Sequence, residues 1–152
     1  MTLTAAATVF VEATPREILE LVVDLHRYRE VDPKILRVVS VVGPDEAGRG
    51  TVRLWARMKG LPPAPDRQDF VLERWRRVTF TGAGRQPARL IFDFVGVVEC
   101  SPGEHGATML THRYEFDFRR PFRFVERRLA GWLQRQIDDE LHDLAAHLSS
   151  AR

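Results

Sequence analysis

The stretch from residue 35 to residue 118 constrains the fold most, because it consists of short segments in which apolar and polar side chains alternate. Gly50–Lys59 shows this period of two, and it recurs in Arg67–Arg74 and Thr108–Phe118. Such alternation is typical of half-buried strands in antiparallel sheets. Glycine- and proline-rich turns separate the segments, so the pattern predicts antiparallel hairpins in series. Further strands are expected at Ile35–Val42, Arg77–Thr81 and Leu90–Cys100.

One more strand and two helices complete the expected order. Thr4–Ala13 is rich in Ala, Thr and Val and is predicted to be a strand. The sequence Thr-Pro-Arg-Glu at 14–17 offers an N-cap, a proline at the first helical position and a capping box, which predicts a helix start. From Pro121 to about Ser149, apolar residues recur every three or four positions, which predicts a long terminal helix. Helices on one side of an antiparallel sheet make an α+β protein.

Length and composition indicate one folded domain over residues 1–152, since 152 residues suffice for a single core. The shares of 44% hydrophobic and 29% charged residues exclude disordered and fibrous classes. No apolar run approaches the roughly 20 residues that cross a bilayer, and no basic region precedes the short apolar stretch at the N-terminus. We therefore expect a cytoplasmic protein. Cys100 is the one cysteine, so it forms no internal disulfide and gives redox chemistry little support.

The charge of the chain argues against a nucleic-acid partner, because the formal net charge is only +2. The densest basic stretch runs from Arg119 to Arg128 and is interrupted by Glu126. Its spacing favours the solvated face of a helix. Weak contact with a membrane surface is the alternative.

Signature motifs of common enzyme chemistry are absent from the sequence. It contains no G-x-G-x-x-G, Walker A or G-x-S-x-G motif, so phosphate-loop, dinucleotide and serine-hydrolase functions have no anchor. The five histidines include no H-x-x-x-H pair, and we expect neither a metal nor a cofactor. Asp138, Asp139 and Glu140 are expected to form an exposed acidic turn of the terminal helix; the alternative for Glu140 is a place at the mouth of an interior cavity.

Four local motifs occur in the order typical of one known fold, with the long terminal helix after them. They are Val9–Ile18, Asp24–Pro33, Phe94–Val98 and Gly106–Leu110. Together they resemble the START-like or Bet v 1-like (SRPBCC) helix-grip superfamily, in its bacterial polyketide cyclase/dehydrase and lipid-transport-like branch, over nearly the whole chain. The resemblance implies a curved antiparallel sheet of about seven strands around the C-terminal helix, with one or two short helices after strand 1. It also implies a cavity between sheet and helix for an apolar or amphipathic molecule.

Strand alternation predicts which side chains line such a cavity. In Thr108–Phe118 the apolar register should point inward, because the alternate residues are polar. The predicted lining consists of Leu54, Met58, Phe70, Phe80, Phe92, Phe94, Leu110, His112, Tyr114, Leu129, Trp132, Leu133 and Gln136. His112 and Tyr114 are the candidate polar or catalytic groups, since a buried imidazole or phenol needs a partner. The same stripe also fits a filled core with a structural histidine.

Three functions remain open at this stage. The first is binding of a hydrophobic or aromatic small molecule such as a lipid or polyketide, with the segments Gly60–Pro65 and Gly82–Pro87 as gates. The second is a polyketide aromatase/cyclase or dehydratase that uses His112 and Tyr114; it ranks lower because the sequence displays few inward polar residues. The third is a lipid chaperone resembling coenzyme Q-binding proteins. The chain is a monomer or a homodimer, for which outward-facing Phe10 and Trp55 are candidate contacts.

Overall fold

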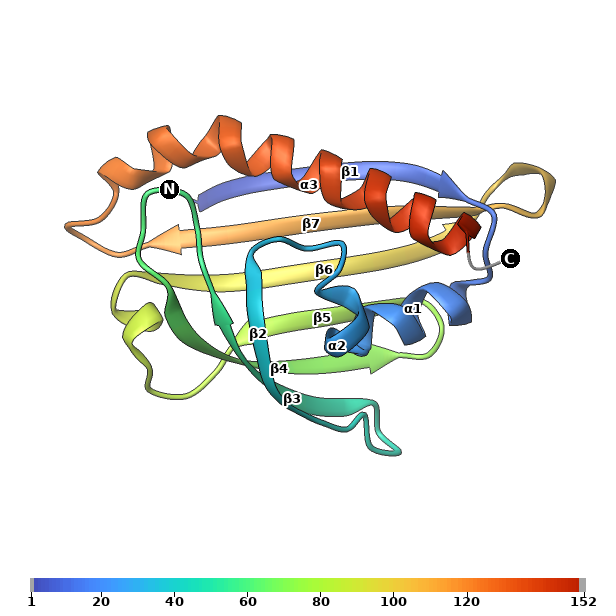
Figure 1. Cartoon of the computed structure of the whole chain (residues 1–152), viewed down its shortest axis with the longest axis horizontal. Helices are drawn as coiled ribbons and strands as arrows, with labels where there is room; N and C mark the ends of the chain where they lie inside the picture. Colours follow the sequence, from blue (N-terminus) through green and yellow to red (C-terminus); the bar gives the residue numbers. More distant parts are fainter. Residues whose placement is uncertain (1, 151–152) are drawn as a thin grey trace.

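The computed structural model describes residues 2–150, which form one antiparallel sheet of seven strands, curved around its helices (Figure 1). The strands are β1 (Thr2–Val11), β2 (Ile35–Val42), β3 (Arg49–Ala56), β4 (Ala64–Glu73), β5 (Arg77–Gly82), β6 (Phe92–Pro102) and β7 (Thr108–Phe118). Their order is β1-β7-β6-β5-β4-β3-β2. Each strand from β2 to β6 pairs with the strand that follows it in the chain, so the predicted series of hairpins is confirmed.

Two short helices follow β1, as predicted: α1 (Pro15–Val23) and α2 (Leu25–Tyr28). The capping box is present, because Thr14 Oγ1 accepts a hydrogen bond from Glu17 N (3.2 Å) and Glu17 Oε2 accepts one from Thr14 N (2.8 Å). These two bonds satisfy amide groups that a helix start otherwise leaves unpaired. The apolar face of α1 is buried against the sheet, with Ile18 and Leu19 fully enclosed.

The long terminal helix α3 (Phe124–Ser150) runs along β1 and β7 (Figure 1). Leu129, Leu133 and Ile137 pack in one apolar cluster with side chains of β1 and β7. Farther along the helix, Leu141 and Leu144 join the larger core beneath α1 and α2. The Gln134 side chain also binds the β1 backbone, since its Nε2 donates to Ala6 O (2.8 Å). No helix within residues 2–150 is both long enough and apolar enough to cross a membrane.

Several element boundaries differ from the sequence prediction. Strand β1 spans Thr2–Val11 rather than Thr4–Ala13, and β3 ends at Ala56 rather than at Lys59. Strand β4 starts at Ala64 and includes Pro65, which tolerates this place because it stands near the first residue of the strand. A 3-10 helix, η1 (Pro87–Leu90), precedes β6 where a strand was expected from Leu90; a second, η2 (Glu104–Gly106), lies between β6 and β7. Helix α3 begins at Phe124 rather than at Pro121.

The predicted register of β7 is confirmed. Leu110, His112, Tyr114 and Phe116 are all buried, while the alternating residues are exposed or half-buried. Phe10 and Trp55 are exposed, as their registers predicted. This alternation brings the one histidine of β7 onto the same face as its aromatic residues.

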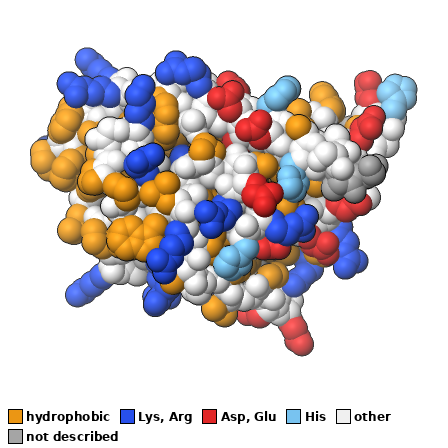
Figure 2. All heavy atoms as spheres, viewed as in Figure 1, with side chains coloured by type: hydrophobic (Ala, Val, Ile, Leu, Met, Phe, Trp, Pro, Cys, Tyr) orange, Lys and Arg blue, Asp and Glu red, His pale blue; other side chains and the backbone are white. Residues whose placement is uncertain are grey.

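The basic start of α3 adjoins an exposed apolar surface. Leu90 of η1 and Phe124 of α3 are 74% and 63% exposed. The arginines between Arg119 and Arg128 are exposed as well. Figure 2 shows hydrophobic side chains gathered at the left end of the molecule, on the face that is in view, with Lys and Arg side chains around them.

Candidate functional site

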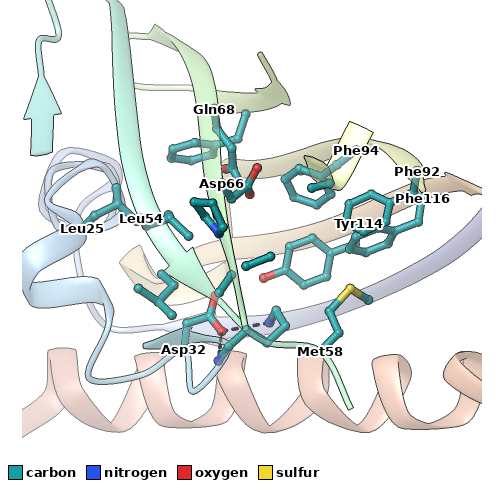
Figure 3. Close-up of a pocket in the computed structure, with 18 of the residues that line it drawn as sticks. Leu25, Asp32, Leu54, Met58, Asp66, Gln68, Phe92, Phe94, Tyr114 and Phe116 are labelled. Atoms are coloured by element: carbon teal, nitrogen blue, oxygen red, sulfur yellow. Dashed lines mark hydrogen bonds and ion pairs between the residues drawn. The ribbon is translucent and has the colours of Figure 1, made fainter. Parts of the chain in front are cut away.

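A cavity of about 310 Å³ lies in the concave side of the sheet. Strands β3 to β7 supply most of its wall. The rest comes from α1, α2, the loop after α2, the start of β2, the β3–β4 loop, η1 and Ile91. Figure 3 shows the rings of Phe92, Phe94, Tyr114 and Phe116 on one side and Leu25 and Leu54 on the other. This volume is at the lower end of the range typical of small-molecule sites.

The predicted lining residues divide into two groups. Those that line the cavity are Leu54, Met58, Phe80, Phe92, Phe94, His112 and Tyr114. Phe70 and Leu110 are buried in the core instead, and the Phe70 ring occupies the space above Gly50, where an added Cβ would lie 2.2 Å from Phe70 Cζ. Two of the predicted gate residues in the β3–β4 loop, Leu61 and Pro62, also line the cavity.

Helix α3 takes a different place from the one expected. Leu129 and Leu133 pack into the apolar cluster with β1 and β7, and Trp132 and Gln136 are half-buried. No α3 side chain lines the cavity within the part of the chain that the structure describes. The physical reason is that the apolar side chains in this part of α3 pack against β1 and β7 and so do not face the cavity.

Helix α3 nevertheless contributes one charged side chain behind the cavity wall, that of Glu140. Its carboxylate accepts hydrogen bonds from Tyr28 Oη (2.5 Å to Oε1) and from Tyr114 Oη (2.7 Å to Oε2). Glu140 is 1% exposed, so its expected place in an exposed acidic turn is wrong; Asp138 and Asp139 are exposed. Position 140 falls on the same helix face as Ile137, Leu141 and Leu144, which explains its burial.

Lys34 lies between two carboxylates at the edge of the cavity. Its Nζ is 2.9 Å from Asp32 Oδ1 and 3.3 Å from Glu140 Oε2. The same ammonium lies 4.7 Å from the centre of the Tyr114 ring, within reach of a cation–π interaction. Burial alone lowers the pKa of Lys34, but the charges of Asp32 and Glu140 outweigh it and hold that pKa above its usual value. Lys34 is therefore a permanent cation that lines the cavity.

The same environment shifts the pKa of Asp32 and of the two tyrosines. Burial, followed by the charge of Glu140, raises the pKa of Asp32, and Lys34 opposes this effect. Burial and the Glu140 charge also raise the pKa of Tyr28 and of Tyr114 well above 10. Both phenols therefore stay protonated and donate hydrogen bonds to Glu140.

His112 is the uncharged member of this group. It is 4% exposed and lines the cavity, with its ring centre 4.4 Å from that of Tyr114. Burial, and then the charge of Lys34, lower its pKa to about 3. Its Nδ1 is buried without a hydrogen-bond partner within residues 2–150 and lies 3.7 Å from Glu140 Oε1. The imidazole is therefore a neutral base beside a carboxylate.

We define Tyr28, Asp32, Lys34, His112, Tyr114 and Glu140 as the buried polar cluster. The sequence predicted His112 and Tyr114 as members of it and gave Glu140 only as a minor alternative, whereas Tyr28, Asp32 and Lys34 were missed. Asp32 and Lys34 lie in the loop after α2, where neither strand nor helix periodicity indicates the direction of a side chain. Glu140 carried a usable signal, because it interrupts the apolar stripe of α3 with a carboxylate.

Known proteins share this architecture at low sequence identity. The Zhui aromatase/cyclase from Streptomyces sp. R1128 superposes with a TM-score of 0.80 at 16% identity, over 98% of this chain and 94% of that one. A START superfamily protein from Mycobacterium smegmatis gives 0.74 at 17% identity, over 95% and 98%. Norcoclaurine synthase from Thalictrum flavum, in complex with dopamine and hydroxybenzaldehyde, gives 0.67 at 12%, over 100% and 88%.

These structural similarities show the helix-grip fold, and a sequence comparison identifies the family. No curated protein matches the chain. The family model described as polyketide cyclase / dehydrase and lipid transport matches residues 2–149. A helix-grip fold with a largely apolar cavity agrees with that match. The chain therefore belongs to the polyketide cyclase/dehydrase and lipid transport family, within the START/Bet v 1 superfamily.

Proposed function

We propose that this protein binds an aromatic, polyketide-like carbonyl compound in the cavity and catalyses proton transfer on it, as an aromatase/cyclase or dehydratase does. The observation that carries the proposal is His112, a neutral imidazole in the cavity wall, backed by the carboxylate of Glu140 and flanked by the Lys34 ammonium. A site that only carries an apolar molecule needs no such grouping of buried charges, which costs desolvation energy.

The proposed chemistry is enolisation of a ketone. His112 removes a proton from the carbon next to the carbonyl, so the C–H bond breaks and an N–H bond forms. The electron pair moves onto the carbonyl oxygen, and the Lys34 ammonium stabilises the resulting oxyanion. Burial and the Lys34 charge disfavour the imidazolium that forms, and Glu140 opposes them, because its Oε1 lies 3.7 Å from His112 Nδ1. The enolate carbon can then attack a second carbonyl of the same molecule, and the oxygen of that carbonyl takes up the proton from the His112 imidazolium. The aldol product can then lose water.

The family and the structural neighbours support this proposal. The family description includes polyketide cyclases and dehydrases, and one neighbour is an aromatase/cyclase. Another neighbour, norcoclaurine synthase, was solved in complex with dopamine and hydroxybenzaldehyde, and each of these molecules contains an aromatic ring. These ligands are flat aromatic molecules, as the Phe92, Phe94 and Phe116 wall of this cavity favours.

Transport of a hydrophobic molecule without turnover is the second candidate. The apolar wall favours it, because most of the lining side chains are aliphatic or aromatic. In this case His112 and Tyr114 would supply polar contacts to the ligand and no proton would be transferred. The lipid-chaperone version adds contact between a membrane and the exposed arginines at the start of α3.

Deuterium exchange distinguishes the two candidates. The probe is 2-acetyl-6-hydroxynaphthalene in D₂O at neutral pH, and NMR follows the loss of its acetyl proton signal. We expect the protein to accelerate exchange over buffer, and His112→Gln to lower that acceleration by roughly 10²-fold or more, as for loss of a general base. His142→Gln is the matched control, because it removes a histidine exposed on α3. Binding of the probe without accelerated exchange would overturn the enzymatic proposal and favour transport.

A further inference from the structure

A second set of polar side chains lines the same cavity, apart from the buried polar cluster. Asp66 and Gln68 lie two residues apart on β4, and Figure 3 shows them on the opposite side of the cavity from Asp32. Asp66 Oδ2 accepts a hydrogen bond from Gln68 Nε2 (2.6 Å). Asp66 Oδ1 accepts one from Gln86 Nε2 (3.0 Å). The carboxylate is thus held by two side-chain amides.

Gln86 is itself fixed by the β4 backbone. Its Oε1 accepts a hydrogen bond from Arg67 N (2.6 Å), and its Nε2 also donates to Arg67 O (2.9 Å). These bonds set the orientation of the amide, so its remaining proton points at Asp66. Gln86 therefore acts as a positioning residue for the Asp66 carboxylate.

Asp66 has spare capacity to accept hydrogen bonds. Burial raises the pKa of Asp66, whereas its bonds to Gln68 and Gln86 and the Arg67 backbone amide favour the ionised form. An ionised carboxylate offers about four acceptor sites, so these three partners do not use all of them. Gln68 Oε1 has no hydrogen-bond partner among residues 2–150, which adds another acceptor at the same place. Both oxygen-bearing groups line the cavity, so a ligand in the cavity can reach them.

Asp66 also differs from the acidic residues of the buried polar cluster in having no counter-charge. Asp32 and Glu140 share Lys34, whereas no Lys or Arg forms an ion pair with Asp66 in the described residues. A half-buried carboxylate beside an apolar wall gains from any further donor, because few water molecules reach it. A ligand in the cavity that donates a hydrogen bond to Asp66 would therefore bind favourably there.

We propose that Asp66 and Gln68 bind a hydroxyl group at the far end of the ligand, while its carbonyl group lies at Lys34 and His112. The inference rests on the proposed function, because it takes the carbonyl end from there. The rings of Phe92 and Phe94 lie along one side of the cavity, where they suit a flat aromatic body. The substrate class is then a hydroxylated aromatic ketone, and Asp66 determines specificity for the hydroxyl group.

Two probes that differ at one end test this inference. They are 2-acetyl-6-hydroxynaphthalene and 2-acetyl-6-methoxynaphthalene, and the fluorescence of each reports its binding. The methoxy probe lacks the hydroxyl proton that would be donated to Asp66. We expect the protein to bind the hydroxy probe about tenfold more tightly, the difference typical of one charge-assisted hydrogen bond. In Asp66→Asn this preference should fall below about threefold, since one acceptor oxygen and the charge are lost.

Control variants separate recognition from general damage. Asp69→Asn removes an exposed carboxylate of the same strand and should keep the tenfold preference. Gln86→Met removes the hydrogen bond that positions the Asp66 carboxylate but keeps Asp66 itself. It should lower the preference for the hydroxy probe over the methoxy probe, while affinity for the methoxy probe stays constant. Because that readout is a ratio of two affinities in one folded protein, a loss of stability does not mimic it.

The outcomes are distinguishable from those of the deuterium-exchange experiment. Equal affinity for the two probes, or an unchanged preference in Asp66→Asn, overturns this inference and leaves the proposed enolisation intact. A preserved hydroxyl preference without accelerated exchange supports the inference and overturns the proposed enolisation. If neither probe binds, both proposals are overturned.

Discussion

Tyr28 Oη donates a hydrogen bond of 2.5 Å to Glu140 Oε1, although the two residues lie 112 positions apart in the chain. The bond joins α2 to α3, and Tyr114 adds β7 to the same carboxylate. One buried side chain of the terminal helix thus connects three elements at the wall of the cavity. This arrangement makes the site part of the fold, so changes to the buried polar cluster should alter both stability and ligand binding.

Replacing Glu140 should destabilise the protein strongly. Glu140→Ala leaves two tyrosine hydroxyls without their acceptor and leaves Lys34 with Asp32 as its remaining ion-pair partner. Breaking a buried ion pair on one side typically costs about 3–5 kcal/mol of the free energy of unfolding. Urea denaturation of wild type and Glu140→Ala measures this loss in the free energy of unfolding. The control Asp139→Ala, at the neighbouring exposed position, should change this free energy by less than about 0.5 kcal/mol. Similar losses for both variants would contradict the role of Glu140.

Stability should fall in mild acid because of His112. Its pKa is about 3 in the folded protein against 6.5 for an unperturbed histidine. Between these values the unfolded chain binds a proton that the folded protein does not, so acidification favours unfolding. From pH 7 to pH 5 this difference amounts to about 2 kcal/mol.

The variant His112→Gln isolates that contribution, since it cannot be protonated. We expect the wild type to lose about 2 kcal/mol more than His112→Gln between pH 7 and pH 5, measured by urea denaturation at each pH. His142→Gln, which removes an exposed histidine, should follow the wild type. Parallel losses in wild type and His112→Gln would mean that His112 is accessible to protons in the folded state.

Two neighbouring residues of α3 should differ in their contributions to stability. Leu133 is fully buried against β1 and β7, and Leu133→Ala should cost about 3 kcal/mol. Trp132 is half-buried at the border of the same cluster, so Trp132→Ala should cost less, about 1–2 kcal/mol. Urea denaturation of both variants checks the order. A larger loss for Trp132→Ala would restore the sequence-based expectation that this ring is buried between helix and sheet.

Gly96 should control the shape of the aromatic wall. A methyl group on its Cα would lie 2.8 Å from Phe94 Cζ and 3.5 Å from Tyr114 Cδ1, so the Phe94 ring must move. Because both rings line the cavity, Gly96→Ala should weaken binding of 2-acetyl-6-hydroxynaphthalene by about tenfold, in line with the usual cost of overpacking. In Gly82→Ala the added methyl group meets no described atom within 4 Å, and affinity should stay unchanged. Unaltered affinity in Gly96→Ala would show that Phe94 moves away from the bound probe.

Local patterns were sufficient to predict most of the fold. The capping box at Thr14 and Glu17 depends on residues three positions apart, and the register of β7 follows from alternation within eleven residues. The 3-10 helix at Pro87–Leu90 was missed because a segment of four residues is too short to show a helical period.

The candidate site was predicted only where it lies on strands. Alternation placed His112, Tyr114 and Phe94 on the inner face, and all three line the cavity. It gave no information on Asp32 or Lys34, which lie in a loop. For Trp132 and Gln136 it gave the helix face and not the packing partner, and α3 turned out to pack on β1 and β7.

Sequence by itself determined the series of hairpins, the capped start of α1 and the inward register of β7, because each depends on residues that are close along the chain. Tertiary structure decided that Glu140 is buried, that Lys34 bridges it to Asp32, and that Asp66 faces the cavity without a counter-charge. These contacts join residues up to 112 positions apart. Their geometry depends on sheet curvature and helix packing, which sum over many distant side chains and leave no periodic signal in the sequence.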